Sequence, residues 1–199
     1  MLSFRYATHD DVSFIVGTQR QPDVAAFVGF VGDEEISASI VDAEQAYFIA
    51  MDDCQIPVGF AYLRQLGRPE RSIELHRLAI ANRNKGYGSE FLKLILVEAI
   101  GPLNANRLWL DVCPENARAR NIYQRLGFAE EGTLREIYFQ NGEFRSTIIM
   151  SILAREYQPH LAEKEAVPQI TVWSSPSLLC QDHKFEIHLR ESDRDCQQQ

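Results

Sequence analysis

The spacing of apolar residues changes near residue 88, and this change orders the elements of the fold. Three short apolar runs precede it, separated by polar turns at 52–57 and 67–71: Ala46–Met51, Val58–Leu66 and Ile73–Ile80. Runs of this length between turn residues indicate the strands of an antiparallel meander. From Gly88 to Ile100 the apolar residues instead recur at helical spacing, and Gly101-Pro102 ends the run. The centre of the chain is therefore predicted to be a sheet followed by a helix.

The flanking segments add further strands and helices. Strand patterns cover Leu2–Ala7, Arg107–Cys113, Phe128–Phe139 and Phe144–Leu153. Helical patterns cover Thr8 to Gln19, Pro22–Asp42 with a break near Gly29 and Gly32, and Asn116–Leu126, which Gly127 should terminate. Asn141-Gly142, between the last two strands, is a strong hairpin signal. This order predicts an α/β fold with a mixed, mostly antiparallel sheet of seven strands and helices packed on both of its faces.

The patterned part of the chain ends near Arg155. Residues 1–155 are predicted to form one domain, and residues 156–199 a C-terminal extension of unknown role. The extension holds two short strand patterns, Ile170–Trp173 and Phe185–Leu189, but it is too short to build a core of its own. A surface appendage, an oligomerisation arm and a partly disordered segment all remain open for it.

Composition excludes several classes of protein. A formal net charge of −8 argues against non-specific nucleic-acid binding. No apolar run approaches the roughly 18 residues that a membrane span needs, and the first residues do not resemble a leader peptide, so a cytoplasmic protein is expected. The four cysteines and five histidines are scattered without ligand spacing, and no metal site is implied.

The charge is unevenly distributed along the chain. Residues 1–72 hold 5 Lys and Arg against 11 Asp and Glu, whereas residues 73–155 hold 11 against 9. An anionic cofactor would suit the middle segment, and a cationic substrate would suit the first. Glu34 and Glu35 lie in that acidic first segment and are candidates for lining a substrate site.

The segment Arg83–Ser89 joins the third strand of the meander to the central helix. Gly86 and Gly88 let the backbone approach a ligand closely, and the first amides of a helix have no partner within it. Those amides and the helix dipole form a site for an anion such as pyrophosphate, beside the cations Arg83 and Lys85. The segment is not a P-loop, and Phe91 stands where a dinucleotide fingerprint needs glycine. An ordinary loop is the alternative.

Two blocks together resemble a known family. R-x-x-G-x-G before the helix and, downstream, Asn116 followed by Tyr123 and Gly127-Phe128 are similar to the conserved blocks of the GNAT superfamily of N-acetyltransferases. The resemblance spans roughly residues 3–153. Glu131–Arg135 and Asn141-Gly142 resemble the branch that holds diamine/spermidine and ribosomal-protein alanine acetyltransferases. That branch often has an acidic residue a few positions after the Asn-Gly turn, where this chain has Arg145 and Ser146.

The resemblance implies a fold of the acyl-CoA N-acyltransferase type with acetyl-CoA as co-substrate. In such a fold Ile73–Ile80 splays from Arg107–Cys113 and offers its backbone to the pantetheine arm. The implied cofactor-binding residues are Leu78, Ala79, Ile80, Arg83, Lys85, Gly86, Tyr87, Gly88, Ser89 and Asn116. Asn116 and Tyr123 lie seven apart, two helical turns, so both can face the thioester.

The resemblance also implies catalytic roles. Tyr123 would protonate the departing thiolate, although a core tyrosine is the alternative. An alkyl ammonium, with a pKa of about 10.4, must lose a proton before it can attack, and Glu74 or a water chain would accept that proton. His76 lies two residues along the same strand, on the same face unless a bulge intervenes, and is a candidate for lining the substrate site. A solvated or salt-bridged Glu74 is the alternative.

The predicted function is acetyl transfer from acetyl-CoA to a primary amine by direct attack. The acceptor is either a small cationic amine of the polyamine kind, which the acidic first segment favours, or a protein N-terminus. A non-catalytic acyl-CoA-binding module is the alternative from another class. The sequence leaves room for a homodimer.

Overall fold

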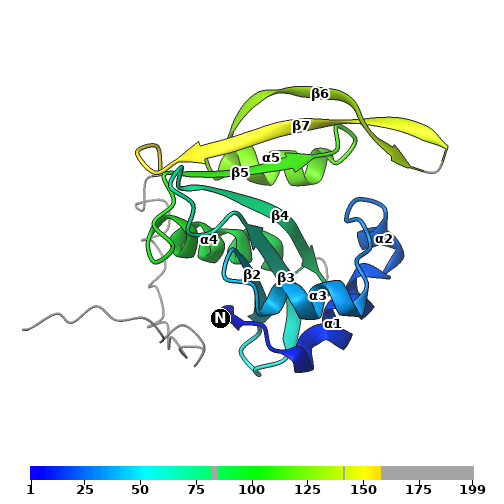
Figure 1. The fold of residues 1–199 in the computed structure, drawn as a ribbon, viewed down its shortest axis with the longest axis vertical. Coiled ribbons are helices and arrows are strands. Elements are labelled where there is room, and N and C mark those ends of the chain that lie inside the picture. The colour runs from blue at the N-terminus through cyan, green and yellow to red at the C-terminus, as the bar shows by residue number, and fades with distance from the viewer. Residues whose placement is uncertain (82–84, 141, 158–199) are drawn as a thin grey trace, which may run out of the picture.

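The computed structural model describes residues 1–81, 85–140 and 142–157. Seven strands form one sheet in the order β1-β2-β3-β4-β5-β7-β6 (Figure 1). The strands are β1 (Ser3–Tyr6), β2 (Gln45–Met51), β3 (Pro57–Arg64), β4 (Ser72–Ile80), β5 (Arg107–Val112), β6 (Ala129–Gln140) and β7 (Glu143–Leu153). All neighbouring strands are antiparallel except β4 and β5. The predicted mixed, mostly antiparallel sheet is confirmed.

Helices cover both faces of this sheet. They are η1 (His9–Asp11), α1 (Val12–Gln19), α2 (Pro22–Ala25), α3 (Asp33–Ile40), α4 (Tyr87–Ile100) and α5 (Ala117–Arg125). Thr8 and Asp11 form the predicted cap, in which the Thr8 amide donates to Asp11 Oδ2 at 2.8 Å. The predicted helical region 22–42 contains α2 and α3 with a connecting segment between them, as the glycine break indicated.

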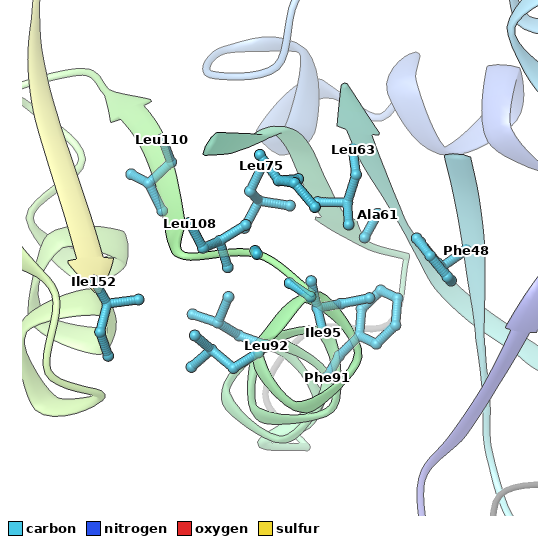
Figure 2. Packing of buried hydrophobic residues seen from close by; sticks show 14 of the residues in the cluster. Phe48, Ala61, Leu63, Leu75, Phe91, Leu92, Ile95, Leu108, Leu110 and Ile152 are labelled. Carbon is cyan, nitrogen blue, oxygen red and sulfur yellow. The ribbon is translucent and has the colours of Figure 1, made fainter. Parts of the chain in front are cut away.

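Two hydrophobic cores lie on opposite sides of the sheet. The larger one packs α4 under the centre of the sheet, where Phe91, Leu92 and Ile95 are fully buried. Figure 2 shows these three side chains against Leu75 from β4 and Leu108 from β5, so α4 joins the two halves of the sheet. The second core packs α1, α2 and α3 against β2 and β3. Each apolar stripe predicted from helical spacing faces one of these cores.

Strands β4 and β5 separate after a short contact. Their pairing consists of Ser72↔Arg107, Ile73↔Leu108 and Glu74↔Trp109. Beyond Glu74, β4 continues beside β3 alone, while β5 continues beside β7 alone. The sheet therefore opens into a V, which confirms the predicted splay.

A β-bulge interrupts β4 within this V. Tyr62 of β3 pairs with Arg77, and the next residue, Leu63, pairs with Leu75, so His76 is the additional residue. The bulge reverses the alternation of the strand, because Leu75 faces the α4 core while Ala79 faces the other core. A bulge therefore does intervene between Glu74 and His76. Strand alternation no longer implies that the two side chains lie on the same face, and their positions come from the structure.

The C-terminal hairpin joins β6 to β7 through Gly142, whose φ of 82° is left-handed. Asn141, the other residue of the predicted turn, lies outside the described residues. So does nearly all of the predicted extension 156–199, including both of its strand patterns; Tyr157 still packs against the α4 core. Among the described residues, no helix is both long and apolar enough to span a membrane.

Candidate active site

Two adjoining cavities fill the V between β4 and β5. The outer cavity, of about 560 Å³, lies at the first turn of α4 and is bounded by α5. The inner cavity, of about 430 Å³, lies between the diverging strands and the β6–β7 hairpin. Both are lined by Phe27 and Val28 after α2, by Leu78 of β4 and by Asn116 before α5. A long ligand can therefore pass from one cavity into the other.

The outer cavity contains the predicted anion site. Gly86 caps α4 with a left-handed φ of 78°, and the amides of Ser89 and Glu90 donate to its carbonyl at 3.2 and 3.3 Å. The amides of Tyr87 and Gly88 in the first turn have no partner inside the helix. Lys85 is exposed, with its ammonium 5.8 Å from the Tyr87 ring centroid. The predicted amides of Tyr87 and Gly88 are thus available, that of Ser89 already has a partner, and Arg83 lies outside the described residues.

The open edge of β4 forms one wall of the outer cavity. The Ala81 amide donates to Val58 of β3 at 2.8 Å, and the Ala79 carbonyl lies against Gly59. Because backbone groups alternate in direction along a strand, the N–H and C=O of Leu78 and Ile80 face away from β3, into the V. No described strand pairs with this side of the two residues, so they have a free peptide edge, whereas the polar groups of Ala79 face β3.

Asn116 and Tyr123 meet the inner cavity from α5. Asn116 caps the helix, and its Oδ1 accepts a hydrogen bond from the Ala119 amide at 3.2 Å. Tyr123 is half-buried, with its ring centroid 5.7 Å from that of Phe128. Burial, assisted by the negative charge of Asp111, raises the pKa of Tyr123 to about 12. Its hydroxyl is thus a proton donor at neutral pH.

Glu74 is held in a buried network behind the inner cavity. Only 3% of the residue is exposed, and its carboxylate accepts hydrogen bonds from Arg64 at 2.8, 2.9 and 3.1 Å and from His76 Nδ1 at 2.9 Å. Burial alone would raise the pKa of Glu74, but the hydrogen bonds from His76 and Arg64 hold it below its usual range. Glu74 lines neither cavity, whereas His76 lines the inner one.

The predicted substrate-lining glutamates lie elsewhere. Glu34 and Glu35 are exposed in the first turn of α3 and line neither cavity.

Charged residues that were not among the predicted site residues line the inner cavity. Asp111 of β5 is the one carboxylate among its described lining residues, and its Oδ2 accepts hydrogen bonds from Thr147 Oγ1 at 2.8 Å and Tyr138 at 3.3 Å. Arg77 and Arg145 face the same space. The signal for Asp111 was present: Leu108, Leu110 and Val112 alternate as core residues, which places the polar residue between them on the opposite face.

The two guanidinium groups that line this cavity differ in their ion-pair and hydrogen-bond partners. Arg145 forms an ion pair with Glu143 at 3.0 Å and approaches Glu115 at 3.9 Å. Arg77 has a buried Nη1 without a hydrogen-bond partner among the described residues. Arg145 thus has acidic partners, whereas this buried nitrogen of Arg77 has none in the described part of the chain.

One acidic cluster lies away from the cavities. Asp52, Asp53 and Cys54 have potential ligand atoms within 4.8 Å of one another in the β2–β3 turn. Asp52 Oδ1 accepts the amides of Cys54 and Ile56 at 3.0 and 2.9 Å, so the turn itself accounts for the arrangement.

Comparison with known proteins agrees with this geometry. The sequence profile of the Acetyltransferase (GNAT) family matches residues 30–128, a range that runs from the segment before α3 through the V and α5. The chain carries an acetyltransferase domain of the GNAT family. It is accordingly an acyl-CoA-dependent N-acyltransferase, and the resemblance inferred from the two sequence blocks is confirmed.

Several relatives share one activity in their names. Spermidine N(1)-acetyltransferase of Vibrio cholerae is 29% identical over 126 residues, which cover 63% of this chain and 73% of that protein. Its counterpart in Escherichia coli is 37% identical over 75 residues, 38% of this chain and 40% of that protein. A putative ribosomal N-acetyltransferase of Bacillus subtilis is 27% identical over 101 residues, 50% of this chain and 55% of that protein.

A solved structure extends the comparison to the fold. Spermidine N-acetyltransferase of Vibrio cholerae in complex with CoA and spermine superimposes with a TM-score of 0.72 at 25% identity. The match covers 78% of this chain and 97% of that one. The seven-stranded sheet and its helices are therefore those of a GNAT acetyltransferase.

Proposed function

We propose that this chain transfers the acetyl group of acetyl-CoA to a primary amine of a small polycationic acceptor of the polyamine kind. The observation that carries the proposal is the V between β4 and β5, which places a free peptide edge next to the first turn of α4 and opens onto a cavity containing Asp111 and His76. The named activity of the relatives supports the polyamine class.

The residues of the outer cavity fit acetyl-CoA. The amides of Tyr87 and Gly88 and the helix dipole would hold the pyrophosphate, with Lys85 as a nearby cation. The free edge of Leu78 and Ile80 would pair with the amides of the pantetheine arm, as an added strand would. The thioester would then lie beside Asn116 at the junction of the two cavities.

The proposed chemistry is direct attack of the neutral amine on the thioester. Tyr123 faces the departing sulfur and donates a hydrogen bond to it. A thiol has a pKa of about 8.5, well below that of Tyr123, so complete proton transfer to the thiolate is uphill. Tyr123 therefore contributes mainly by stabilising the developing negative charge. Glu74, the predicted base, is buried and can serve the amine only through a residue of the cavity wall.

A protein N-terminus is the second candidate acceptor. Arg77 and Arg145 line the inner cavity and offer N–H donors that peptide carbonyl groups or acidic side chains can accept. A polyamine carries no such acceptor and is repelled by both cations. The two arginines and the similarity to a putative ribosomal N-acetyltransferase therefore support a protein N-terminus as the second candidate acceptor.

The test measures thiol release from acetyl-CoA across a panel of amines. Spermine, spermidine, a diamine and peptides with free N-termini are compared at equal concentration, and CoA binding is measured separately by titration calorimetry. We expect turnover with saturation on the polyamines. Turnover on peptides alone would select the second candidate. Binding of CoA with a blank panel would select a non-catalytic acyl-CoA-binding module.

The proposal also includes a cytoplasmic location, a reaction without a metal ion, and a homodimer. A cytoplasmic location suits Cys54 and Cys113, which are both free thiols. No step of the proposed mechanism uses a metal ion, so a chelator should leave turnover unchanged. Pairing of two copies is supported by large apolar side chains exposed on the β6–β7 hairpin, among them Leu134, Phe139 and Phe144.

A further inference from the structure

We propose that His76 takes the proton from the acceptor amine and that Glu74 positions it for this step. In this dyad His76 is the catalytic residue, since it faces the inner cavity, and Glu74 acts through it. The inference rests on the proposed function, because it requires an amine acceptor to enter that cavity.

The bulge in β4 fixes the place of His76. As the additional residue opposite Tyr62 and Leu63, it is directed into the V instead of following the alternation of the strand. Its ring lies edge-on to Tyr62 with centroids 5.5 Å apart, and 23% of the side chain remains exposed, at the inner cavity. Bulges that turn a side chain toward a site are common next to active centres.

The contact with Glu74 determines the tautomer of the imidazole. Since hydrogen bonds from His76 and Arg64 keep the Glu74 carboxyl ionised at neutral pH, its oxygens can only accept hydrogen bonds. His76 Nδ1, 2.9 Å from Glu74 Oε1, must therefore carry the proton of the neutral ring. Nε2, on the opposite side of the ring, has no hydrogen-bond partner in the described part of the chain, so its lone pair can accept a proton. An imidazole serves as a base when a carboxylate accepts the N–H of one ring nitrogen and the lone pair of the other nitrogen is available for a proton.

This arrangement also explains why Glu74 cannot act directly. An ammonium group with a pKa of about 10.4 is more than 99% protonated at neutral pH and must give up a proton before attack. Glu74 is buried, lines neither cavity, and has both oxygens occupied by Arg64 and His76. His76 lines the cavity, and an imidazole accepts a proton at neutral pH more readily than a carboxylate does.

The proton transfers balance over one turnover. The ammonium first gives one proton to His76 Nε2, and Glu74 stabilises the imidazolium that forms. The neutral nitrogen then bonds to the thioester carbon, the carbon–sulfur bond breaks, and the thiolate accepts a hydrogen bond from Tyr123. The second proton of the nitrogen reaches the sulfur, directly or through solvent, and His76 releases the first proton to solvent. The products are the N-acetyl amine, the CoA thiol and one proton.

Other charged and titratable groups face the same space. They are Arg77 on β4, Asp111 and Cys113 at the end of β5, Tyr123 on α5, Tyr138 on β6 and Arg145 on β7, with Tyr62 of β3 against the ring and Arg64 of β3 behind Glu74. The two arginines and the two carboxylates, Glu74 and Asp111, place charges of opposite sign around the ring. Glu74 is the one in direct contact with His76, and the proposal assigns it the positioning role for that reason.

His76→Asn tests the roles of the two ring nitrogens separately. An asparagine amide can replace the Nδ1 donor to Glu74 but has no group at the place of Nε2. We expect kcat with spermine to fall by about 100-fold or more, the range of general-base catalysis, while the Kd for CoA changes by less than about twofold. His9→Asn, the same change on exposed η1, should leave kcat unchanged. Thermal melting of each variant reports whether it is folded.

The pH dependence distinguishes proton transfer from packing. As the pH approaches about 10.4, half of the amine arrives neutral and needs no base. The deficit of His76→Asn should therefore shrink steadily between pH 7 and 10. A deficit that stays constant over this range would assign His76 a structural role and overturn the proposal.

The role of Glu74 has a readout that is independent of turnover. Nitrogen-15 NMR of the resting protein reports which ring nitrogen of His76 carries the proton. We expect the Nδ1–H form in the wild type and a mixture of both forms in Glu74→Gln. An Nε2–H form in the wild type would overturn the dyad.

Failure of the dyad and failure of the proposed function give different results. A wild-type protein that turns over no amine of the panel would overturn the transfer reaction itself. A wild type that turns over spermine, with His76→Asn equally active, would overturn the dyad alone.

Discussion

At the scale of single residues, the binding of a cationic acceptor in the inner cavity should depend on one carboxylate, that of Asp111. Among the described residues, Asp111 is held from one side only, because the hydrogen bonds from Thr147 and Tyr138 both reach Oδ2. Oδ1 has no partner among these residues and can accept an N–H of a cationic acceptor. Asp111→Asn should raise the KM for spermine by roughly 10- to 150-fold, which corresponds to the loss of a charge-assisted hydrogen bond of about 1.5–3 kcal/mol. Initial rates over a range of spermine concentrations provide the measurement.

A variant of the hydrogen-bond partner distinguishes loss of the Asp111 charge from loss of the contact that Asp111 makes with β7. Thr147→Val breaks the same Thr147–Asp111 hydrogen bond but keeps the carboxylate. It should lower the melting temperature and leave the KM for spermine close to that of the wild type. Equal increases in KM for both variants would mean that Asp111 acts by holding β5 to β7 and not by binding the amine.

Tyr123 is tested by removal of one oxygen. Tyr123→Phe keeps the ring against Phe128 but removes the hydroxyl that faces the inner cavity. We expect kcat to fall by up to about 100-fold, with the Kd for CoA within about twofold of the wild-type value. Tyr6→Phe is the control, because the Tyr6 hydroxyl bonds Glu98 at 3.0 Å outside both cavities; it should cost stability and spare kcat. An unchanged kcat in Tyr123→Phe would remove this residue from the mechanism.

At the scale of elements, β4 must keep its position for the V to bind a ligand. An added Cβ at Gly59 of β3 would lie 2.5 Å from the Ala79 carbonyl and 2.6 Å from Ile80 Cδ1. Gly59→Ala should therefore displace β4 at the free edge of Leu78 and Ile80. We expect a loss of about 1–3 kcal/mol in the free energy of unfolding, typical of overpacking, and a weaker Kd for CoA by calorimetry.

Gly17→Ala is the matched control for this change. Gly17 lies in α1, and beyond its chain neighbours and the backbone of its own helix no atom lies within 4 Å of an added Cβ. Because alanine favours helix over glycine, this variant should gain up to about 1 kcal/mol in stability and bind CoA as the wild type does. CoA affinity unchanged in Gly59→Ala would show that the edge of β4 is not part of the cofactor site.

The same element shows where sequence patterns suffice and where they do not. Alternation and helical spacing are local, so they predicted the strands and helices to within a few residues. The bulge at His76 arises from the register between β3 and β4, and the buried state of Glu74 depends on Arg64, its pairing partner across that register. Neither is visible from spacing along one strand. The glycines and the helix start at 83–89 predicted the anion site, and the family resemblance supplied the splay. The position of Arg145 in the inner cavity required the hairpin to be placed over the V.

At the scale of the whole molecule, the two halves of the sheet are joined weakly on one side and firmly on the other. Strands β4 and β5 share three residue pairs, whereas the α4 core contacts both strands with fully buried side chains. A ligand bound in the V would contact Leu78 on one wall and Asn116 on the other, and would therefore hold the halves together. Ligand binding and cooperative unfolding should be coupled through this junction.

This coupling predicts the response of the folded protein to its co-substrate. Acetyl-CoA at about 100 times its Kd should stabilise the native state by about 2.7 kcal/mol, and the melting temperature should rise with the logarithm of its concentration. Gly86→Val, which strains the left-handed cap of α4, should melt without this dependence because its anion site is distorted. Amide hydrogen exchange locates the effect: protection should increase in β4 and the first turn of α4, and remain unchanged in α3, which packs in the other core and lines neither cavity. Protection that rises equally in α3 would mean that the ligand stabilises the fold as a whole and does not join its halves.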